Sequence, residues 1–219
     1  KSPFPKVLCP GCGLGRLPFD LARCGYAAQG NEFSYHMLLG SHLVLNRSRQ
    51  AESFTIYPYA LSTSDRVRST DHLRPVKVPD VCPSHALPRN SQLSMVAGEF
   101  IEVYSEQHQT FDGVATAFFL DTAKNVFLYI RIIAQVTRPG GIWTNLGPLL
   151  YHYADVMNTV SIELSWEEVR PAICRYFDII EESVLVAQYA STRIRYNCKF
   201  FVAVRNSVPT SGMSHPVFG

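Results

Sequence analysis

The chain has 219 residues, of which 47% are hydrophobic and 17% charged, and its formal net charge is +2 at pH 7. This length predicts a single globular domain over 1–219 with one substantial core. Lys and Arg are scattered, which argues against a nucleic-acid partner, and no apolar run approaches the roughly 20 residues that cross a bilayer. We therefore expect a soluble cytoplasmic protein, possible also in the nucleus, without nucleic-acid or membrane partners.

Hydrophobic spacing in the first part of the chain predicts two strand–helix units followed by an irregular region. The expected elements are a strand at 6–9, a helix at 16–24 ended by Gly25, a strand at 26–31 closing on Glu32, and a helix at 33–45. Residues 53–93, rich in Pro, Ser, Asp and His, predict a long irregular insertion. An insertion of this length usually has a function.

Regular structure is expected again beyond the insertion. The predicted elements are strands at 93–100 closing on Glu99 and 111–121 closing on Asp121, a helix at 125–136, a strand at 141–149, a helix at 165–177 and a strand at 197–206. Ser165 and Glu168 have the spacing of a capping box at the start of the last helix. Strands alternating with helices predict an α/β fold with a parallel sheet.

Three glycines, Gly11, Gly13 and Gly15, stand between the first strand and the first helix. A glycine turn there, with an acid such as Glu32 closing the next strand, is typical of a site for the adenosine part of a cofactor, in which the carboxylate binds the ribose. Glu99 and Asp121 are expected at the same edge of the sheet. A turn needed only for packing is the alternative interpretation.

The spacing of the glycines favours one class of cofactor. A dinucleotide fingerprint needs its third glycine one residue later, where Arg16 stands. S-adenosylmethionine has no phosphate to bind, and the R-P-G-G turn before a late strand also suits a methyltransferase. An NAD-dependent oxidoreductase is the disfavoured alternative.

Six cysteines are present, and Cys9 and Cys12 form a C-x-x-C. No second pair or histidine follows at the spacing of metal ligands, so we expect buried thiols and no metal site.

Several long motifs extend this interpretation. The segments PGCGLGRLPFDLARCGYAAQGNEFSYHMLL, DHLRPVKVPDV, FFLDTAKNV, RPGGIWTNLGPLLYHY and SIELSWEEV stand in one order between about Val7 and Val204. Together they resemble the carnosine N-methyltransferase family. The resemblance implies a Rossmann-like class I methyltransferase fold, with a mostly parallel seven-stranded sheet and helices on both faces. It also implies methyl transfer from S-adenosylmethionine to an imidazole nitrogen of carnosine, giving anserine, and a homodimer is possible.

The resemblance also implies roles for individual residues. The implied cofactor-binding residues are Gly11, Gly13, Gly15, Arg16, Glu32, Glu99, Phe100 and Val114. Glu99 stands where the family commonly has Asp. The implied substrate-binding residues are Phe118, Asp121, His152, Tyr189 and Tyr196, of which Asp121, His152 and Tyr196 are also the expected catalytic residues.

These residue types suit the methylation of an imidazole. A neutral imidazole has one N–H and one lone pair, so a carboxylate that accepts the N–H leaves the other nitrogen free to react. Asp121 would also stabilise the imidazolium as its charge develops. The alternatives are a cap on the next helix for Asp121, an ordinary core histidine for His152, and core aromatics for Tyr189 and Tyr196.

The sequence departs from the family at two places. Family members have a helical segment before the first strand, whereas six residues precede Val7 here, so either this sequence is trimmed or the cofactor pocket is more open. The spacing from Tyr189 to Tyr196 is also short, which bears on substrate choice. The expected acceptor is carnosine or a related histidine-containing peptide, and the rival functions are methylation of a protein histidine or of another small imidazole, and a degenerate methyltransferase fold that only binds the cofactor.

Overall fold

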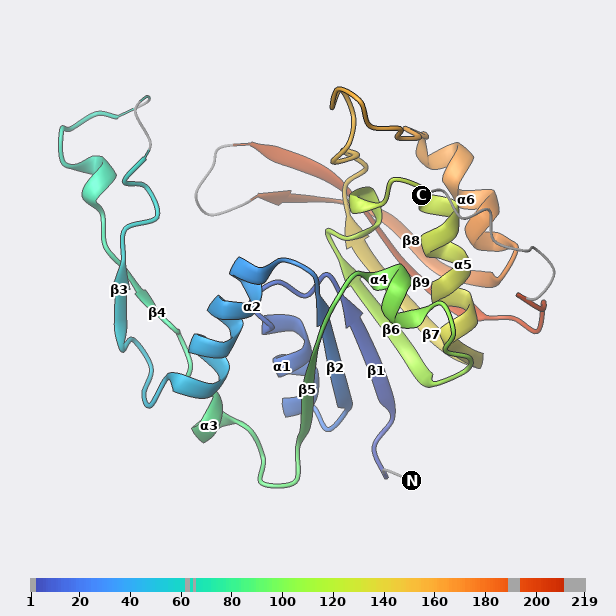
Figure 1. Cartoon of the computed structure of the whole chain (residues 1–219), viewed down its shortest axis with the longest axis horizontal. Helices are drawn as coiled ribbons and strands as arrows, with labels where there is room; N and C mark the ends of the chain where they lie inside the picture. Colours follow the sequence, from blue (N-terminus) through green and yellow to red (C-terminus); the bar gives the residue numbers. More distant parts are fainter. Residues whose placement is uncertain (1–2, 62–63, 65, 189–193, 211–219) are drawn as a thin grey trace.

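A computed structural model describes residues 3–61, 64, 66–188 and 194–210 of the chain. Its centre is a seven-stranded sheet of order β5-β2-β1-β6-β7-β9-β8 (Figure 1). These strands are β1 (Lys6–Pro10), β2 (Ala27–Glu32), β5 (Gln92–Ala97), β6 (Phe111–Ala117), β7 (Thr137–Gly147), β8 (Phe177–Gln188) and β9 (Arg195–Arg205). The first five in the spatial order are parallel, and β9 and β8 are antiparallel to their neighbours. The expected α/β fold with a mostly parallel sheet is confirmed.

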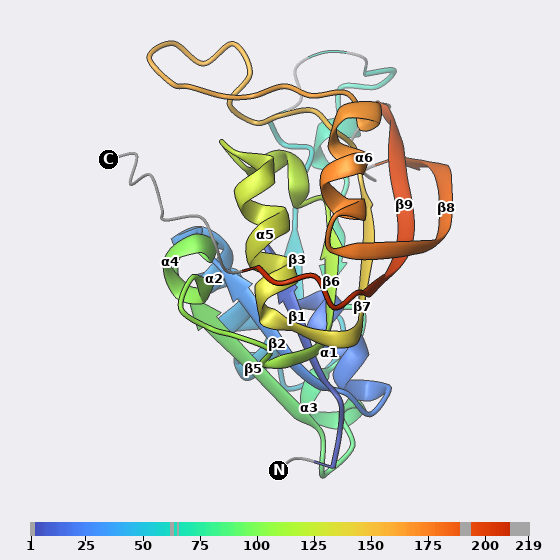
Figure 2. The same ribbon diagram turned by 90° about the vertical axis from the view of Figure 1, so that its right-hand side faces the viewer.

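Helices cover both faces of the sheet. They are α1 (Arg16–Arg23), α2 (Tyr35–His42), α3 (Pro83–Ala86), α4 (Phe100–Tyr104), α5 (Val126–Val136) and α6 (Trp166–Cys174), with a π-helical turn η1 (Leu43–Arg47) and a 3-10 turn η3 (Leu120–Thr122). Figures 1 and 2 show α1 and α2 on one side of the sheet and α4, α5 and α6 on the other. In the described residues no helix is both long and apolar enough to span a bilayer.

The predicted capping box is confirmed, and the structure shows a second side-chain cap that was not predicted. Ser165 and Glu168 form the expected capping box at the start of α6, where the Glu168 carboxylate accepts from the Ser165 amide at 2.7 Å. The helix predicted at 33–45 begins one residue after Ser34, whose hydroxyl accepts from the Met37 amide at 3.5 Å. Its last turn changes to the π-helical η1.

Two predicted strand ends are wrong. β5 ends at Ala97 and β6 at Ala117, so Glu99 and Asp121 lie beyond the strands instead of closing them. The backbone turns out of each strand at the next residue, because Gly98 has a φ of 144° and Phe118 a φ of 51°. Glu99 then caps α4, and Asp121 lies in η3. Both carboxylates nevertheless remain at the carboxyl edge of the sheet.

The segment 53–93 is less irregular than expected. It contains an antiparallel pair of short strands, β3 (Phe54–Ile56) and β4 (Val76–Val78), a 3-10 turn η2 (Asp71–Leu73), the helix α3 and the start of β5. Figure 1 shows the β3–β4 pair extending away from the main sheet. Strands of three residues are too short for a periodic pattern to predict them.

The strand β8 is another element that the periodicity did not predict. It forms the edge of the sheet and pairs with β9 along nearly its whole length. Most of its side chains are exposed, including the apolar Ile180, Val184 and Val186. The usual alternation of buried and exposed residues is therefore absent from this strand.

A buried polar network joins the middle of the sheet to β9. The indole of Trp143, which is fully buried, donates to the Thr116 hydroxyl at 2.9 Å. That hydroxyl donates to Asn145 Oδ1 at 2.8 Å, and the Asn145 amide donates to the Lys199 carbonyl at 3.0 Å. Satisfied buried networks of this kind specify one arrangement of neighbouring strands, here β6, β7 and β9, beneath the site.

Candidate active site

The turn between β1 and α1 presents open backbone at the carboxyl edge of the sheet. Gly11 and Gly13 have φ values of 61° and 57°, a region that L side chains rarely adopt. A Cβ at Gly11 would lie 2.5 Å from the Phe119 ring, whereas a Cβ at Gly13 would meet no heavy atom of the described residues within 4 Å. Packing therefore explains Gly11, but at Gly13 the turn leaves a space that a ligand can fill.

Glu32 organises this turn from the end of β2. Its Oε2 accepts from the Gly13 amide at 2.9 Å, and its Oε1 accepts from the Phe33 and Ser34 amides at 2.8 and 2.7 Å. A carboxylate has about four lone-pair sites, so one remains for a further donor such as a ribose hydroxyl. The partly exposed Glu32 carboxylate and the space at Gly13 together fit an adenosine-type ligand.

Glu99 stands beside Glu32, because the Gly98 amide donates to the Glu32 carbonyl at 3.1 Å. Its carboxylate accepts from the Glu102 amide at 3.0 Å and so caps α4. Only Oε2 is used in this bond, which leaves Glu99 Oε1 available at the same edge. The structure thus brings Gly13, Glu32 and Glu99 together, as the sequence predicts.

Two other predicted cofactor contacts, Phe100 and Val114, lie in the core instead of at this edge. The Phe100 side chain is 3% exposed and packs against Phe119 and Tyr129 in the core, so it does not line an open adenine pocket. Val114 is 2% exposed in the middle of β6, below the edge where a ligand would bind. The structure does not support these two assignments, because both side chains are buried in the core.

Arg16, a further predicted cofactor contact, pairs with acidic side chains instead. Its guanidinium forms ion pairs with Asp20 at 2.6 Å and with Asp80 at 2.8 Å. It therefore links α1 to the segment that follows β4, instead of pointing over the glycine turn. Gly15, the remaining residue of the motif, is buried with its would-be Cβ 3.0 Å from Leu45, which indicates packing against η1.

Phe119 connects the glycine turn to the second half of the site. Its ring lies against Gly11, stacks on Tyr129 with ring centroids 4.8 Å apart, and meets Phe100 edge-on at 5.2 Å. Each such aromatic pair contributes about 0.5–1.5 kcal/mol beyond its buried area. This rigid cluster sets the position of Asp121, two residues further along.

Asp121 is a buried carboxylate, 2% exposed, at the start of the segment that leads to α5. Its Oδ2 accepts from the Leu150 amide at 3.1 Å, and its backbone carbonyl accepts from the His152 amide at 2.8 Å. Burial raises the pKa of this carboxyl, while the Leu150 amide and the nearby His152 act in the opposite direction. Asn125, not Asp121, caps α5, so the helix-cap interpretation of Asp121 is wrong.

The other predicted substrate residues that the structure describes lie in the neighbourhood of Asp121, His152 through its amide and Tyr196 through Phe118. His152 is exposed, so it is not the core histidine of the alternative interpretation. The rings of Phe118 and Tyr196 meet edge-on with centroids 6.2 Å apart, and half-buried Tyr196 lines a cavity. Tyr189 lies outside the described residues. The structure therefore gathers four of the five predicted substrate residues.

The expectation of buried thiols is correct for Cys9, Cys82 and Cys198, but Cys12 and Cys174 are only partly buried and Cys24 is exposed. Burial raises the pKa of the Cys9 thiol, and burial together with Glu32 raises that of Cys12 to about 12. Thiols held neutral are poor nucleophiles and poor ligands. Among the described residues no cluster of His, Cys, Asp and Glu could hold a metal ion.

Comparisons with known proteins agree with this geometry. The chain matches the family model described as carnosine N-methyltransferase over residues 1–207. The carnosine N-methyltransferase of Rattus norvegicus is 46% identical over 203 residues, which are 90% of this chain and 50% of the relative. That of Dictyostelium discoideum is 41% identical over 210 residues, which are 92% and 44% of the two chains. The chain thus spans about half the length of these relatives.

Solved structures show the same fold at low sequence identity. A SAM-dependent methyltransferase of Methanosarcina mazei has a TM-score of 0.61 at 14% identity, covering 94% of each chain. Magnesium protoporphyrin IX methyltransferase of Synechocystis, solved with bound SAM, has a TM-score of 0.56 at 13% identity, covering 93% of this chain and 71% of that one. These likenesses establish the class I methyltransferase fold.

Proposed function

Because this chain belongs to the carnosine N-methyltransferase family, we propose that it methylates an imidazole nitrogen of carnosine, giving anserine, with S-adenosylmethionine as the methyl donor. The observation that carries the proposal is the buried carboxylate of Asp121. It lies beside His152, three residues after Phe118, whose ring meets Tyr196, and, through Phe119, next to the glycine turn. A protein that only bound the cofactor would not need this second group of residues.

The residues at the glycine turn are those that would hold the cofactor. Bound S-adenosylmethionine supplies a methyl group on a positively charged sulfur. The free space at Gly13 would admit the ligand to the backbone, Glu32 has a lone-pair site for a ribose hydroxyl, and Glu99 Oε1 is available beside it. The acids at this edge also favour the positive charge of the donor.

Asp121 would choose the nitrogen that reacts. An imidazole N–H donated to this carboxylate fixes one tautomer and leaves the other nitrogen with its lone pair exposed. As that nitrogen gains a bond to carbon, positive charge develops on the ring, and the buried carboxylate stabilises it. Low exposure strengthens this interaction because little water screens it.

Access to Asp121 requires an exchange of hydrogen-bond donors. The carboxylate is covered by residues 149–152, and the Leu150 amide occupies Oδ2. We propose that the substrate N–H replaces this amide, while the bond from the His152 amide to the Asp121 carbonyl keeps the segment in place. His152 and Tyr196 would then orient the ring from two sides.

Calorimetric titration with S-adenosylhomocysteine, in the presence and absence of carnosine, tests the proposal. We expect each ligand to tighten the binding of the other, because coupling between two sites is reciprocal. Binding of S-adenosylhomocysteine without any effect of carnosine would contradict the assigned substrate. Absence of binding would contradict the assigned cofactor site.

A further inference from the structure

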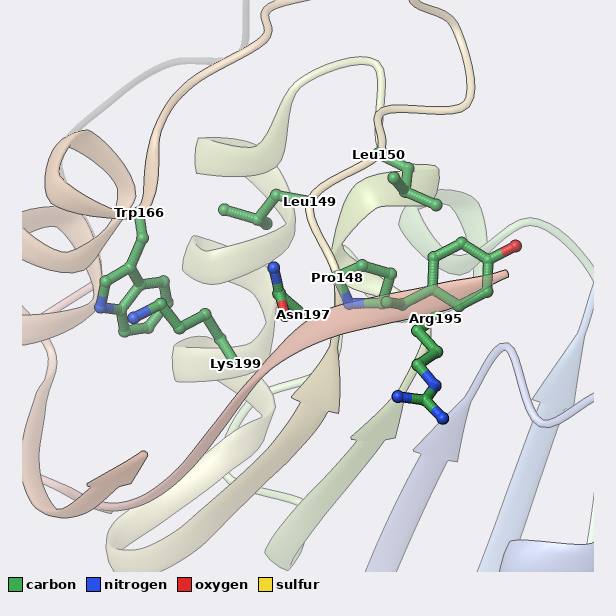
Figure 3. A pocket seen from close by; sticks show the side chains of 8 residues that line it. Pro148, Leu149, Leu150, Trp166, Arg195, Asn197 and Lys199 are labelled. Carbon is green, nitrogen blue, oxygen red and sulfur yellow. The ribbon is translucent and has the colours of Figure 1, made fainter. Parts of the chain in front are cut away.

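A cavity of about 380 Å³ opens between β9 and the segment that follows β7. We call it the β9 cavity. Its wall includes Leu150, Trp166, Arg195, Tyr196, Asn197 and Lys199. Figure 3 shows Lys199 beside Trp166, with Arg195 further along β9. Cavities of this size commonly hold small molecules. Nothing in the function proposed so far uses its cationic side chains.

One end of the β9 cavity adjoins Asp121. Leu150, which lines the cavity, donates its amide to the Asp121 carboxylate at 3.1 Å. Tyr196, also in the wall, contacts the ring of Phe118 three residues before Asp121. If the imidazole of the methyl acceptor donates to the Asp121 carboxylate, the rest of the acceptor would therefore extend toward this cavity.

The wall of the cavity is positively charged. The described residues that line it include Arg195 and Lys199 but no Asp or Glu. The described ion pairs include neither of these cations. The Lys199 amine lies 5.2 Å from the centre of the Trp166 ring.

An acid that interacts with Lys199 is already engaged. Glu182 accepts from the Arg170 guanidinium at 2.8 Å and from the Trp166 indole at 2.6 Å. Lys199 contributes only weakly to the lowered pKa of Glu182, which arises first from the bond to Arg170. Two cations on β9 thus line a cavity in whose described wall no acidic side chain stands, and this favours an anionic ligand.

We propose that the β9 cavity binds the carboxylate of the methyl acceptor, with Arg195 as the direct partner and Lys199 adding to the positive field. This inference rests on the proposed function and refines its substrate class. In a histidine with a free carboxylate, the carboxylate lies a few bonds from the imidazole, so it would extend toward the cavity that adjoins Asp121 through Leu150. A histidine inside a polypeptide has a neutral amide at that position, so the cavity selects a C-terminal histidine such as that of carnosine.

The test compares carnosine with carnosinamide, in which a neutral carboxamide replaces the carboxylate. Binding is followed by tryptophan fluorescence, because Trp166 lines the cavity whereas Trp143 is fully buried in the core. Trp166→Phe identifies the signal that comes from the cavity. The same two dipeptides are then used as methyl acceptors for the wild-type chain, Arg195→Gln and the matched control Arg175→Gln. Arg175 is exposed and follows α6 outside the cavity wall.

We expect the wild-type chain to prefer carnosine by about tenfold in Kd and KM, the size of one charge-assisted hydrogen bond. Arg195→Gln should remove this preference by weakening carnosine alone, with kcat little changed, and Arg175→Gln should retain it. Equal affinity of the wild type for both dipeptides, or equal weakening of both by Arg195→Gln, would overturn the inference. If neither dipeptide is methylated, the proposed function fails, and the fluorescence titration decides the carboxylate subsite separately.

Discussion

Asp121→Asn separates chemistry from binding more cleanly than any other single change. Asparagine has nearly the same shape, and its carbonyl oxygen can still accept the Leu150 amide that now bonds to Oδ2. The variant therefore keeps the local fold but loses the negative charge. We expect kcat for carnosine to fall steeply while the affinity for S-adenosylhomocysteine stays within about twofold, since the change lies outside the glycine turn.

The magnitude follows from the charge that develops on the imidazole. A unit charge pair about 4 Å apart at an effective dielectric constant of about 20 is worth about 4 kcal/mol. Because each 1.36 kcal/mol changes a rate about tenfold, loss of this stabilisation corresponds to about a 1,000-fold lower kcat. The burial of Asp121 supports the low dielectric constant used here.

The pH dependence of stability gives an independent readout of the same residue. Burial raises the pKa of Asp121 in the folded chain above its value in the unfolded chain. Between these two pKa values the folded state binds more protons, so the free energy of unfolding decreases as the pH rises through that interval. Asparagine has no such titration. Asp121→Asn should flatten this interval and leave the unfolding midpoint at pH 7 unchanged or higher.

The assay measures anserine by mass spectrometry under single-turnover conditions, so that binding does not limit the rate. Asp112→Asn is the matched control, because Asp112 lies near the opposite end of β6, where it pairs with Arg138. We expect this control to retain wild-type turnover. An Asp121→Asn variant with unchanged turnover would refute the role of the carboxylate, and equal losses in both variants would point to a general effect on folding.

Three further predictions concern the turn, the core and the thiols. Gly13→Ala and Gly140→Ala should each destabilise the fold by about 1–2 kcal/mol, since both glycines have a positive φ with open space around them. Only Gly13→Ala should weaken the binding of S-adenosylhomocysteine measured by calorimetry. Equal affinities would show that no ligand approaches Gly13. Trp143→Phe removes the donor to Thr116 and should cost about 2 kcal/mol in urea unfolding; a cost below about 0.5 kcal/mol would mean that the network is unimportant. Cys9 and Cys12 should resist alkylation at pH 8 in the folded chain, because burial raises the pKa of both thiols, and modification detected by peptide mass spectrometry before unfolding would contradict this.

Local sequence signals determined much of the fold. The apolar run before Gly11, the helical spacing after Gly15 and the capping box at Ser165 each concern residues close together in the chain, and each is found in the structure. The glycine turn and Glu32 were predicted together for the same reason. Backbone conformation and helix capping depend on neighbouring residues, so a single sequence reports them directly.

The surroundings of individual side chains were decided by the tertiary structure. Nothing near Phe100 or Val114 in the sequence shows that both belong to the core, and nothing near Arg16 indicates its pairing with Asp80, which lies 64 residues away. The partner of Asp121, the Leu150 amide, comes from 29 residues further along the chain. Periodicity carries no information on such distant contacts.

The β9 cavity also depends on contacts between segments that are distant in the sequence. Its wall combines residues just after β7 with the first residue of α6 and the start of β9, and these segments meet only when β9 inserts antiparallel beside β7. In the sequence, Arg195 and Lys199 are two cations among twenty. Their shared cavity arises because strand pairing puts them on one wall, whereas Glu182, an acid that interacts with Lys199, is held by Arg170. The sequence thus determined which chemical groups are available and the local elements that carry them, and long-range packing decided which of those groups face one another.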